Sequence, residues 1–444
     1  MREILREKLR VALNEPLPAL TRRDARFPGV PGKALAVIGV RRAGKTSLLW
    51  QCLGERLAAG APREGLMLVG LEDDRLSGMT TEDLSWLLEE YFRQVPGLRG
   101  STGVTLAFDE IQEVPGWERF LRRLIDTENV QLLVSGSSSK LLSREIATSL
   151  RGRALEVLLH PFSFRESLRH AGQEPEATWD HLSKTRRSDL DSRLRTYLVH
   201  GGFPEAQNLQ DPDRLTLLRN HVDVVVLRDV IERHAVSNPL PLRWLQRQLL
   251  SNPAGTFSVQ KFHDQLKSQG VAVSKDTLHA YLSHLEDAFL VRVLQMSSAS
   301  ERQRLVNPRK VYPVDPGLIP LFERSGRPNL GHALETVVLL ELERRGYEAD
   351  YVRTAEGWEV DFLAQAPGRP SLLVQVCTDL QAEETWRREI RALEAARALY
   401  PEALCHLVTL DPTPPRLELP ATIHWAPATR WLLDSARVDG DSSR

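Results

Sequence analysis

The stretch ALAVIGVRRAGKTSLLW, residues 34–50, decides the fold of the N-terminal part of the chain. Its first five residues are apolar and predict a buried strand, and the residues from Lys45 onward predict a helix. Between the two, Gly39, Gly44, Lys45 and Thr46 have the spacing G-x-x-x-x-G-K-[ST] of a phosphate-binding loop. The stretch therefore predicts an α/β fold with a P-loop core.

The same residues predict the ligands of the loop. Its glycines allow backbone amides to approach a polyphosphate, Lys45 can reach the β and γ phosphates, and the Thr46 hydroxyl can ligate Mg²⁺. The alternative is a glycine-rich turn that matches by chance. We predict ATP and Mg²⁺ as ligands, with nucleotide contacts from Gly39, Arg42, Ala43, Gly44, Lys45, Thr46 and Ser47.

A second stretch, VTLAFDEIQEV at residues 104–114, is an apolar strand that ends in two carboxylates. We expect Asp109 to hold Mg²⁺, directly or through water, and Glu110 to orient and polarise the attacking water, since phosphoryl transfer needs both. Adjacent carboxylates at the end of a strand also occur in solvated loops. Their position downstream of a phosphate loop favours the catalytic interpretation.

Two further pairs of residues are candidates for the same site. The strand predicted within VQLLVSGSSS, residues 130–139, ends in Ser135 and Ser137, and we favour Ser135 for contact with the γ-phosphate or the attacking water. Plain turn chemistry explains these serines equally well. Arg151 and Arg153 precede another apolar strand, and an arginine from a neighbouring subunit can neutralise charge on the transferred phosphoryl group. Each is a candidate arginine finger, with a surface salt bridge as the alternative.

In this order the motifs resemble those of the AAA+-like P-loop ATPases of bacteria and archaea that carry a C-terminal nuclease-like domain. Besides the two stretches above, the matching segments are residues 135–154, 161–166 (PFSFRE), 201–205 (GGFPE), 307–318 (NPRKVYPVDPGL) and 331–362. The resemblance implies a sensor role for Ser135, a trans-acting Arg151 or Arg153, and a helical lid that contains residues 201–205. It also implies a homo-oligomer, for which a hexameric ring is the common form.

Length and composition exclude several classes of protein. A chain of 444 residues is expected to form roughly two to four domains, and 42% hydrophobic with 26% charged residues is typical of a globular protein. No apolar run suits a membrane span or a signal peptide, so we expect a cytoplasmic protein with no membrane partner. Three scattered cysteines argue against disulfide and zinc frameworks. With a net charge of −1, any binding of nucleic acid must come from local basic patches.

The pattern of helices and strands divides the chain into six segments. They are an N-terminal helical segment (1–30), the P-loop ATPase core (31–160), a helical lid or connector (161–240), a winged helix (241–312), a restriction-endonuclease-like α/β domain (313–430) and a tail (431–444). The winged helix is predicted because three helical segments are followed there by a strand-turn-strand pattern.

Basic residues gather around that strand-turn-strand pattern, where they can contact backbone phosphates. They are Arg292, Arg302, Arg304, Arg309 and Lys310. The third helix of the segment has a mixed charge, which is not typical of a sequence reader. We therefore predict sequence-nonspecific contact with DNA, and the alternative is a winged helix that packs against protein.

From residue 330 the order of a helix, three strands and a helix resembles the PD-(D/E)XK nuclease core. That chemistry requires an acid at Glu335, an acid at Asp361 and a Glu-x-Lys sequence on the third strand. The carboxylates would hold Mg²⁺ and the lysine would position water. This chain has Gln375 and Cys377 instead. Glutamine lacks the negative charge, and a thiol at pH 7 is mostly neutral. We predict a degenerate nuclease site with a role in binding or structure.

These motifs favour an ATP-hydrolysing AAA+-type motor that acts on DNA by translocation, unwinding or remodelling, with helicase action as one form. An ATP-dependent DNA nuclease is the first alternative. The second is a nucleotide-switched ATPase that recruits a protein partner and whose hydrolysis does not respond to DNA.

Overall fold

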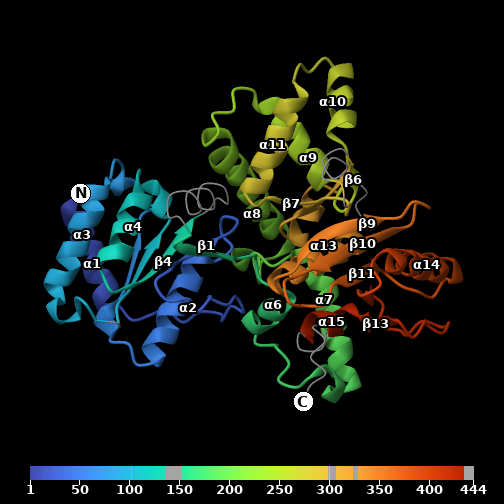
Figure 1. Cartoon of the computed structure of the whole chain (residues 1–444), viewed down its shortest axis with the longest axis horizontal. Helices are drawn as coiled ribbons and strands as arrows, with labels where there is room; N and C mark the ends of the chain where they lie inside the picture. The colour runs from blue at the N-terminus through green and yellow to red at the C-terminus, as the bar shows by residue number, and fades with distance from the viewer. Residues whose placement is uncertain (102, 137–151, 299, 301–306, 324–328, 435–444) are drawn as a thin grey trace. The chain divides into compact units, whose positions relative to one another are not determined.

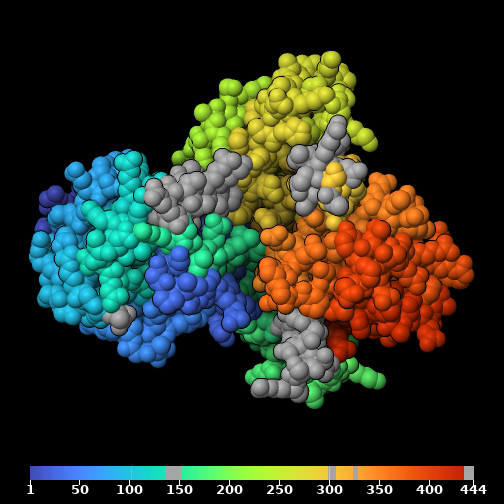
Figure 2. Space-filling model, viewed as in Figure 1, coloured from blue at the N-terminus to red at the C-terminus, as the bar shows by residue number. Residues whose placement is uncertain are grey.

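The computed structural model describes residues 1–444 except 102, 137–151, 299, 301–306, 324–328 and 435–444 (Figure 1). The chain forms two compact units. The first unit comprises residues 1–159 with 287–289, and the second comprises residues 160–286 with 290–444. Figure 2 shows their surfaces, in which the first unit runs from blue to turquoise. Among the described residues, no helix combines the length and the apolar character that a membrane span requires.

The first unit is a parallel α/β sheet with flanking helices. Its elements are α1 (Arg2–Asn14), β1 (Ala34–Ile38), α2 (Lys45–Ala58), β2 (Leu66–Gly70), α3 (Thr81–Gln94), β3 (Thr105–Asp109), α4 (Trp117–Thr127), β4 (Gln131–Gly136) and β5 (Ala154–Leu158). The five strands pair in parallel in the order β2-β3-β4-β1-β5. The predicted α/β fold with a P-loop core is therefore confirmed.

The apolar residues of the central strands explain this sheet. All five residues of β1 and of β3 are buried, as expected for strands covered on both faces. The register aligns Val37 on β1 with Ser135 on β4, and β3 lies on the other side of β4. Because the carboxyl ends of parallel strands lie at one edge of a sheet, the phosphate loop after β1 and the acids at the end of β3 come together there.

The second unit combines helices with two sheets. Its elements are α6 (Phe164–His170), α7 (Lys184–His200), α8 (Asp211–Val224) with a π-helical continuation (Val225–Glu232), α9 (Pro239–Leu250), β6 (Thr256–Phe257), α10 (Val259–Ser268), α11 (Lys275–Asp287), β7 (Val291–Leu294), β8 (Arg309–Pro313), α13 (Leu330–Arg344), β9 (Glu348–Arg353), β10 (Glu359–Gln365), β11 (Leu372–Cys377), α14 (Glu383–Leu399), β12 (Leu404–Thr409), β13 (Ile423–Pro427) and α15 (Ala428–Leu433).

The two sheets of this unit differ in size and in pairing. The small sheet has the order β6-β8-β7 and is antiparallel. The large sheet has the order β13-β12-β11-β10-β9, with antiparallel pairs from β9 to β11 and parallel pairs from β11 to β13. Alternate residues of β11 enter two apolar cores, Leu372 and Val374 with α13, and Leu373 with α14. Helices therefore cover both faces of the large sheet.

Backbone hydrogen bonds join the small sheet to the large one. The Ser297 amide donates to the Tyr351 carbonyl at 2.8 Å, and the Tyr351 amide donates to the Gln295 carbonyl at 3.0 Å. Tyr351 lies on β9, and its hydroxyl donates to the Pro308 carbonyl at 2.6 Å, directly before β8. The predicted segments 241–312 and 313–430 are thus packed together within the second unit.

A buried carboxylate fastens two glycine-containing loops of the second unit. Asp315 is 1% exposed, and it accepts hydrogen bonds from the Gly202 amide at 2.7 Å and the Gly317 amide at 2.8 Å. Burial raises the pKa of Asp315 to about 6, although both amide bonds act to lower it. The sequence shows these loops only as GGFPE and DPG turns, without the contact between them.

We expect Asp315 to give the second unit a measurable dependence of stability on pH. Because the pKa is higher in the folded state than in the unfolded chain, its stabilisation is complete at acid pH and is lost as pH rises through about 6. The free energy of unfolding of the parent relative to Asp315→Asn should fall by about 2 kcal/mol between pH 4 and pH 7. Urea unfolding of both proteins across this range measures the difference, and parallel pH profiles would contradict the expectation.

Candidate functional site

The phosphate loop has a backbone conformation that requires glycine. Gly39 has φ +151°, and a Cβ atom on it would lie 2.2 Å from the Leu159 carbonyl oxygen. Gly44 has φ +97° and lies directly before α2, whose first amides are free to meet an anion. The predicted contact residues Arg42, Ala43, Thr46 and Ser47 lie around this turn.

Lys45 is held inside the loop. The residue is 5% exposed, and its ammonium donates to the carbonyls of Gly39 at 3.2 Å and Val40 at 3.4 Å. The same nitrogen lies 3.5 Å from the Glu110 carboxylate. A buried ammonium at the centre of the loop provides the positive charge that a polyphosphate needs.

Three oxygen-bearing side chains meet at the ends of α2, β3 and β4. The Thr46 hydroxyl donates to Asp109 Oδ2 at 2.6 Å, and the Ser135 hydroxyl donates to Asp109 Oδ1. Burial raises the pKa of Asp109 above its ordinary value, although the two hydroxyl bonds oppose this. A cation bound beside Asp109 would offset the cost of burying its charge, so the residue pair Thr46 and Asp109 fits Mg²⁺.

Glu110 has an unusual backbone and a firm set of partners. Its φ and ψ are +53° and +51°, in the left-handed region, and its amide donates to Ser135 Oγ at 2.9 Å. Its carboxylate accepts a hydrogen bond from Gln112 and faces Lys45. Burial alone would raise the pKa of Glu110, but Lys45 and Gln112 outweigh it and hold the pKa below its ordinary value. The residue is therefore ionised at neutral pH and positioned beside the loop.

Ser135 lies in the interior, where it connects the two acids. It is fully buried, and its hydroxyl bridges Asp109 and the Glu110 amide. In this structure it positions the acidic pair, a role that the sequence interpretation as a phosphate sensor did not include. Ser137, the other serine considered, lies outside the described residues.

Sequence reasoning missed a buried arginine behind the loop. Arg23 is 3% exposed and donates to the Ala43 carbonyl at 2.7 Å. Its backbone exchanges two hydrogen bonds with the Gln51 side chain on α2, at 2.7 and 3.1 Å. Arg23 therefore ties the N-terminal segment to the phosphate loop. Arg23 belongs to no motif with a fixed spacing, so the sequence contains no signal that would place it beside the phosphate loop.

Of the two candidate arginine fingers, the structure describes Arg153 alone. Arg151 lies outside the described residues. Arg153 forms an ion pair with Asp126 at the surface of the first unit, and its side chain is 38% exposed. A surface salt bridge of this kind is the alternative raised by the sequence, and it is weak enough for the arginine to change partner.

The predicted DNA-contacting cluster is not a single exposed patch. Arg302 and Arg304 lie outside the described residues, and Arg309 is half-buried on β8. Arg292 pairs with Glu343 at 2.7 Å. Lys310 is 4% exposed and pairs with Glu359 and Asp361. Carboxylates of the same unit therefore already pair with Arg292 and Lys310, and the contact of these two residues with phosphates stays a prediction.

The residues predicted as a degenerate nuclease site lie close together in the second unit. Glu335 comes from α13, Asp361 from β10, and Gln375 and Cys377 from β11. The Gln375 side chain accepts from the Asp361 amide at 3.2 Å and donates to Glu389 at 2.8 Å. Burial raises the pKa of the Cys377 thiol, and the charge of Glu389 raises it further. The thiol therefore stays neutral.

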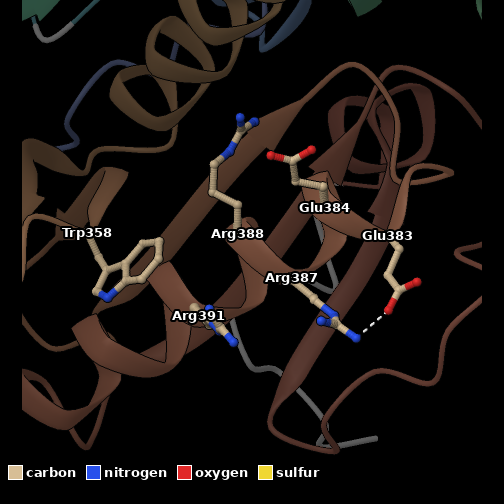
Figure 3. A pocket seen from close by; sticks show the side chains of 6 residues that line it. All are labelled: Trp358, Glu383, Glu384, Arg387, Arg388 and Arg391. Atoms are coloured by element: carbon tan, nitrogen blue, oxygen red, sulfur yellow. Dashed lines mark ion pairs between the residues drawn. The ribbon is translucent and has the colours of Figure 1, made fainter.

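One pocket of the second unit lies on the solvent side of α14. It has a volume of about 630 Å³ and is lined by Trp358, Glu383, Glu384, Arg387, Arg388 and Arg391. The charged side chains project from α14, and Trp358 lies beside the helix (Figure 3). Arg387 pairs with Glu383, and Arg388 pairs with Glu389 at 2.6 Å. The pocket therefore combines an indole ring with three guanidinium groups.

Comparisons with known proteins agree with the geometry of the first unit. Residues 31–168 match the family model described as an AAA domain, and residues 191–325 match a domain of unknown function, DUF8612. The uncharacterized protein MJ1544 of Methanocaldococcus jannaschii is 33% identical over 379 residues, which cover 84% of this chain and 81% of the relative. An uncharacterized protein of Haemophilus influenzae is 30% identical over 345 residues, covering 78% and 82%.

A solved structure is also similar. The Walker-type ATPase paby2304 of Pyrococcus abyssi is 17% identical, with a TM-score of 0.40. The similarity covers 72% of this chain and 95% of that chain.

Proposed function

This chain belongs to the family of MJ1544 and carries an AAA domain, and from that premise we propose that it hydrolyses Mg²⁺-ATP and couples hydrolysis to work on DNA. The observation that carries the proposal is the hydrogen-bonded set formed by Lys45, Thr46, Asp109 and Glu110. Each of these groups has a partner that holds it in place before nucleotide arrives.

The phosphate loop would bind the nucleotide through groups that are already oriented. The backbone amides around Gly44 and the first turn of α2 face the anion, and Lys45 adds a charge that water does not screen well at 5% exposure. Thr46 and Asp109 would hold Mg²⁺, which supplies charge neutralisation to the phosphates when bound. Ser135 keeps Asp109 oriented toward Thr46.

Glu110 would act on the attacking water. Its ionised carboxylate would accept a hydrogen bond from the water. It would then take up the water's proton as the water oxygen attacks the γ-phosphate. The Gln112 and Lys45 contacts fix the carboxylate, and the bond from its own amide to Ser135 fixes the backbone. An arginine of a second copy, Arg153 or Arg151, would stabilise the transferred phosphoryl group, which makes the active form a homo-oligomer such as a hexameric ring.

DNA contact would come from the second unit. We infer a winged helix from α9 to β8, because its elements follow the order helix, strand, helix, helix, strand, strand. Arg309 remains as a candidate on its wing. The pocket on α14 offers guanidinium groups for phosphates and Trp358 for stacking on a base, the combination that binds single strands without sequence preference.

A test compares steady-state ATP hydrolysis with and without single-stranded, duplex and forked DNA. We expect DNA to raise the rate, and the double variant Arg387→Ala/Arg391→Ala to lose most of this stimulation while keeping its basal rate. Arg397→Ala is the matched control, since this arginine is also exposed on α14 but does not line the pocket. A rate that no DNA changes would reject the motor and favour a nucleotide-switched ATPase with a protein partner.

A further inference from the structure

Lys310 brings a positive charge into the interior of the second unit. Its ammonium lies 2.8 Å from Glu359 and 3.1 Å from Asp361, and the Tyr351 ring centroid is 5.7 Å away. Lysine is rarely buried unless its charge is paired. With Glu335 of α13, whose charge acts on Lys310, these groups form the acid–lysine cluster: Lys310, Glu335, Glu359 and Asp361. The lysine comes from the small sheet and the acids come from the large sheet and its helix.

Both carboxylate oxygen atoms of Asp361 are already engaged. Asp361 Oδ1 faces the Lys310 ammonium, and Asp361 Oδ2 accepts from the Val376 amide at 3.0 Å. Gln375, which stands where a nuclease core has a ligating acid, uses its oxygen on the Asp361 amide and its nitrogen on Glu389. A divalent ion such as Mg²⁺ requires near-octahedral oxygen ligands. Asp361 and Gln375 therefore cannot turn toward such an ion without losing these bonds.

The charges of the cluster are consistent with a single internal cation. Burial, followed by the nearby Asp361 charge, raises the pKa of Glu335 well above its ordinary value, while the Lys310 charge acts to lower it. Burial alone would lower the pKa of Lys310, but Asp361, Glu335 and Glu359 raise it above its ordinary value. The ammonium therefore stays charged and faces the carboxyl groups of Glu359 and Asp361.

We propose that the Lys310 ammonium takes the place of a divalent cation among Glu335, Glu359 and Asp361, so that this site binds neither Mg²⁺ nor Mn²⁺ and joins the two sheets. The resemblance to a nuclease core would require a metal at these acids. The residues present do not fit that requirement, because the ammonium of Lys310, which lies on β8, already pairs with Glu359 and Asp361. Metal-dependent cleavage of phosphodiesters at this site is therefore not expected.

The test counts Mn²⁺ ions bound to the full-length chain without nucleotide, by electron paramagnetic resonance of the free ion. All proteins carry Asp109→Asn, which removes the metal ligand of the nucleotide site. The set comprises this parent, Lys310→Met, Asp361→Asn, the Lys310→Met/Asp361→Asn pair, and Lys267→Met as a control at an exposed lysine of the same unit. Melting temperatures with and without Mn²⁺ are measured on the same samples.

We expect Asp361→Asn and Lys267→Met to bind as much Mn²⁺ as the parent. Lys310→Met should gain one bound ion per chain, have a lower melting temperature that Mn²⁺ partly restores, and lose the gained ion when Asp361→Asn is added. The proposal is overturned if Asp361→Asn removes an ion from the parent, or if folded Lys310→Met gains none. Should Lys310→Met fail to fold under both conditions, the comparison of the parent with Asp361→Asn decides alone.

Discussion

Replacing Glu110 by glutamine will lower the steady-state rate of ATP hydrolysis by roughly 100-fold or more, the range expected for loss of a general base. Glutamine has the same shape and can still accept a hydrogen bond from Gln112, but it cannot withdraw a proton from water. Nucleotide binding should change little, because the loop amides, Lys45 and Thr46 remain. Steady-state rates and titration with a fluorescent ATP analogue measure the two effects separately.

The matched control for this substitution is Glu113→Gln. Glu113 lies in the same turn after β3 but is exposed, and it is three residues from Glu110. The control should hydrolyse ATP at the parent rate. Hydrolysis by Glu110→Gln at a rate close to the control would show that another group activates the water, and the assignment of Glu110 would have to be abandoned.

The nucleotide site could be predicted from the sequence to a large degree because its chemistry depends on local spacing. Gly39, Gly44 and Lys45 are neighbours along the chain, and the parallel sheet brings the end of β3 beside them. The role of Ser135 could not be assigned in this way. Its bond to the Glu110 amide depends on the left-handed backbone of Glu110, which the sequence does not signal.

In the second unit the elements could be predicted better than their contacts. The helices and strands from residue 239 onward follow the periodicity of the sequence, but the basic hairpin was interpreted as exposed. On β8, Lys310 follows Arg309 and is followed by Val311, Tyr312 and Pro313, a sequence without the strict alternation that would assign each side chain to one face of the sheet. Its burial depends on acids that lie 49 and 51 residues further on, at Glu359 and Asp361, and only the pairing of the two sheets brings them near.

Replacing Gly202 by alanine will destabilise the second unit by roughly 3 kcal/mol, the upper range for overpacking a buried position. An added Cβ would lie 2.1 Å from the Phe162 carbonyl oxygen. Neither backbone can easily move away, because the Phe162 amide donates to the Gly202 carbonyl at 2.7 Å and the Gly202 amide donates to Asp315 at 2.7 Å. Relief of the clash therefore costs at least one of these buried hydrogen bonds.

Gly331→Ala is the matched control for this change, since a Cβ there would meet the Thr378 methyl at an ordinary 3.6 Å. It lies in α13, where alanine is also the better helix former, so the control should be neutral or slightly stabilising. Urea unfolding followed by hydrogen exchange of peptides around residues 162, 202 and 315 will measure the effect and locate it. Gly202→Ala could unfold at the same urea concentration as Gly331→Ala, with amides around residues 162, 202 and 315 that exchange no faster. Such a result would show that the contact of Gly202 with Phe162 and Asp315 does not stabilise these loops.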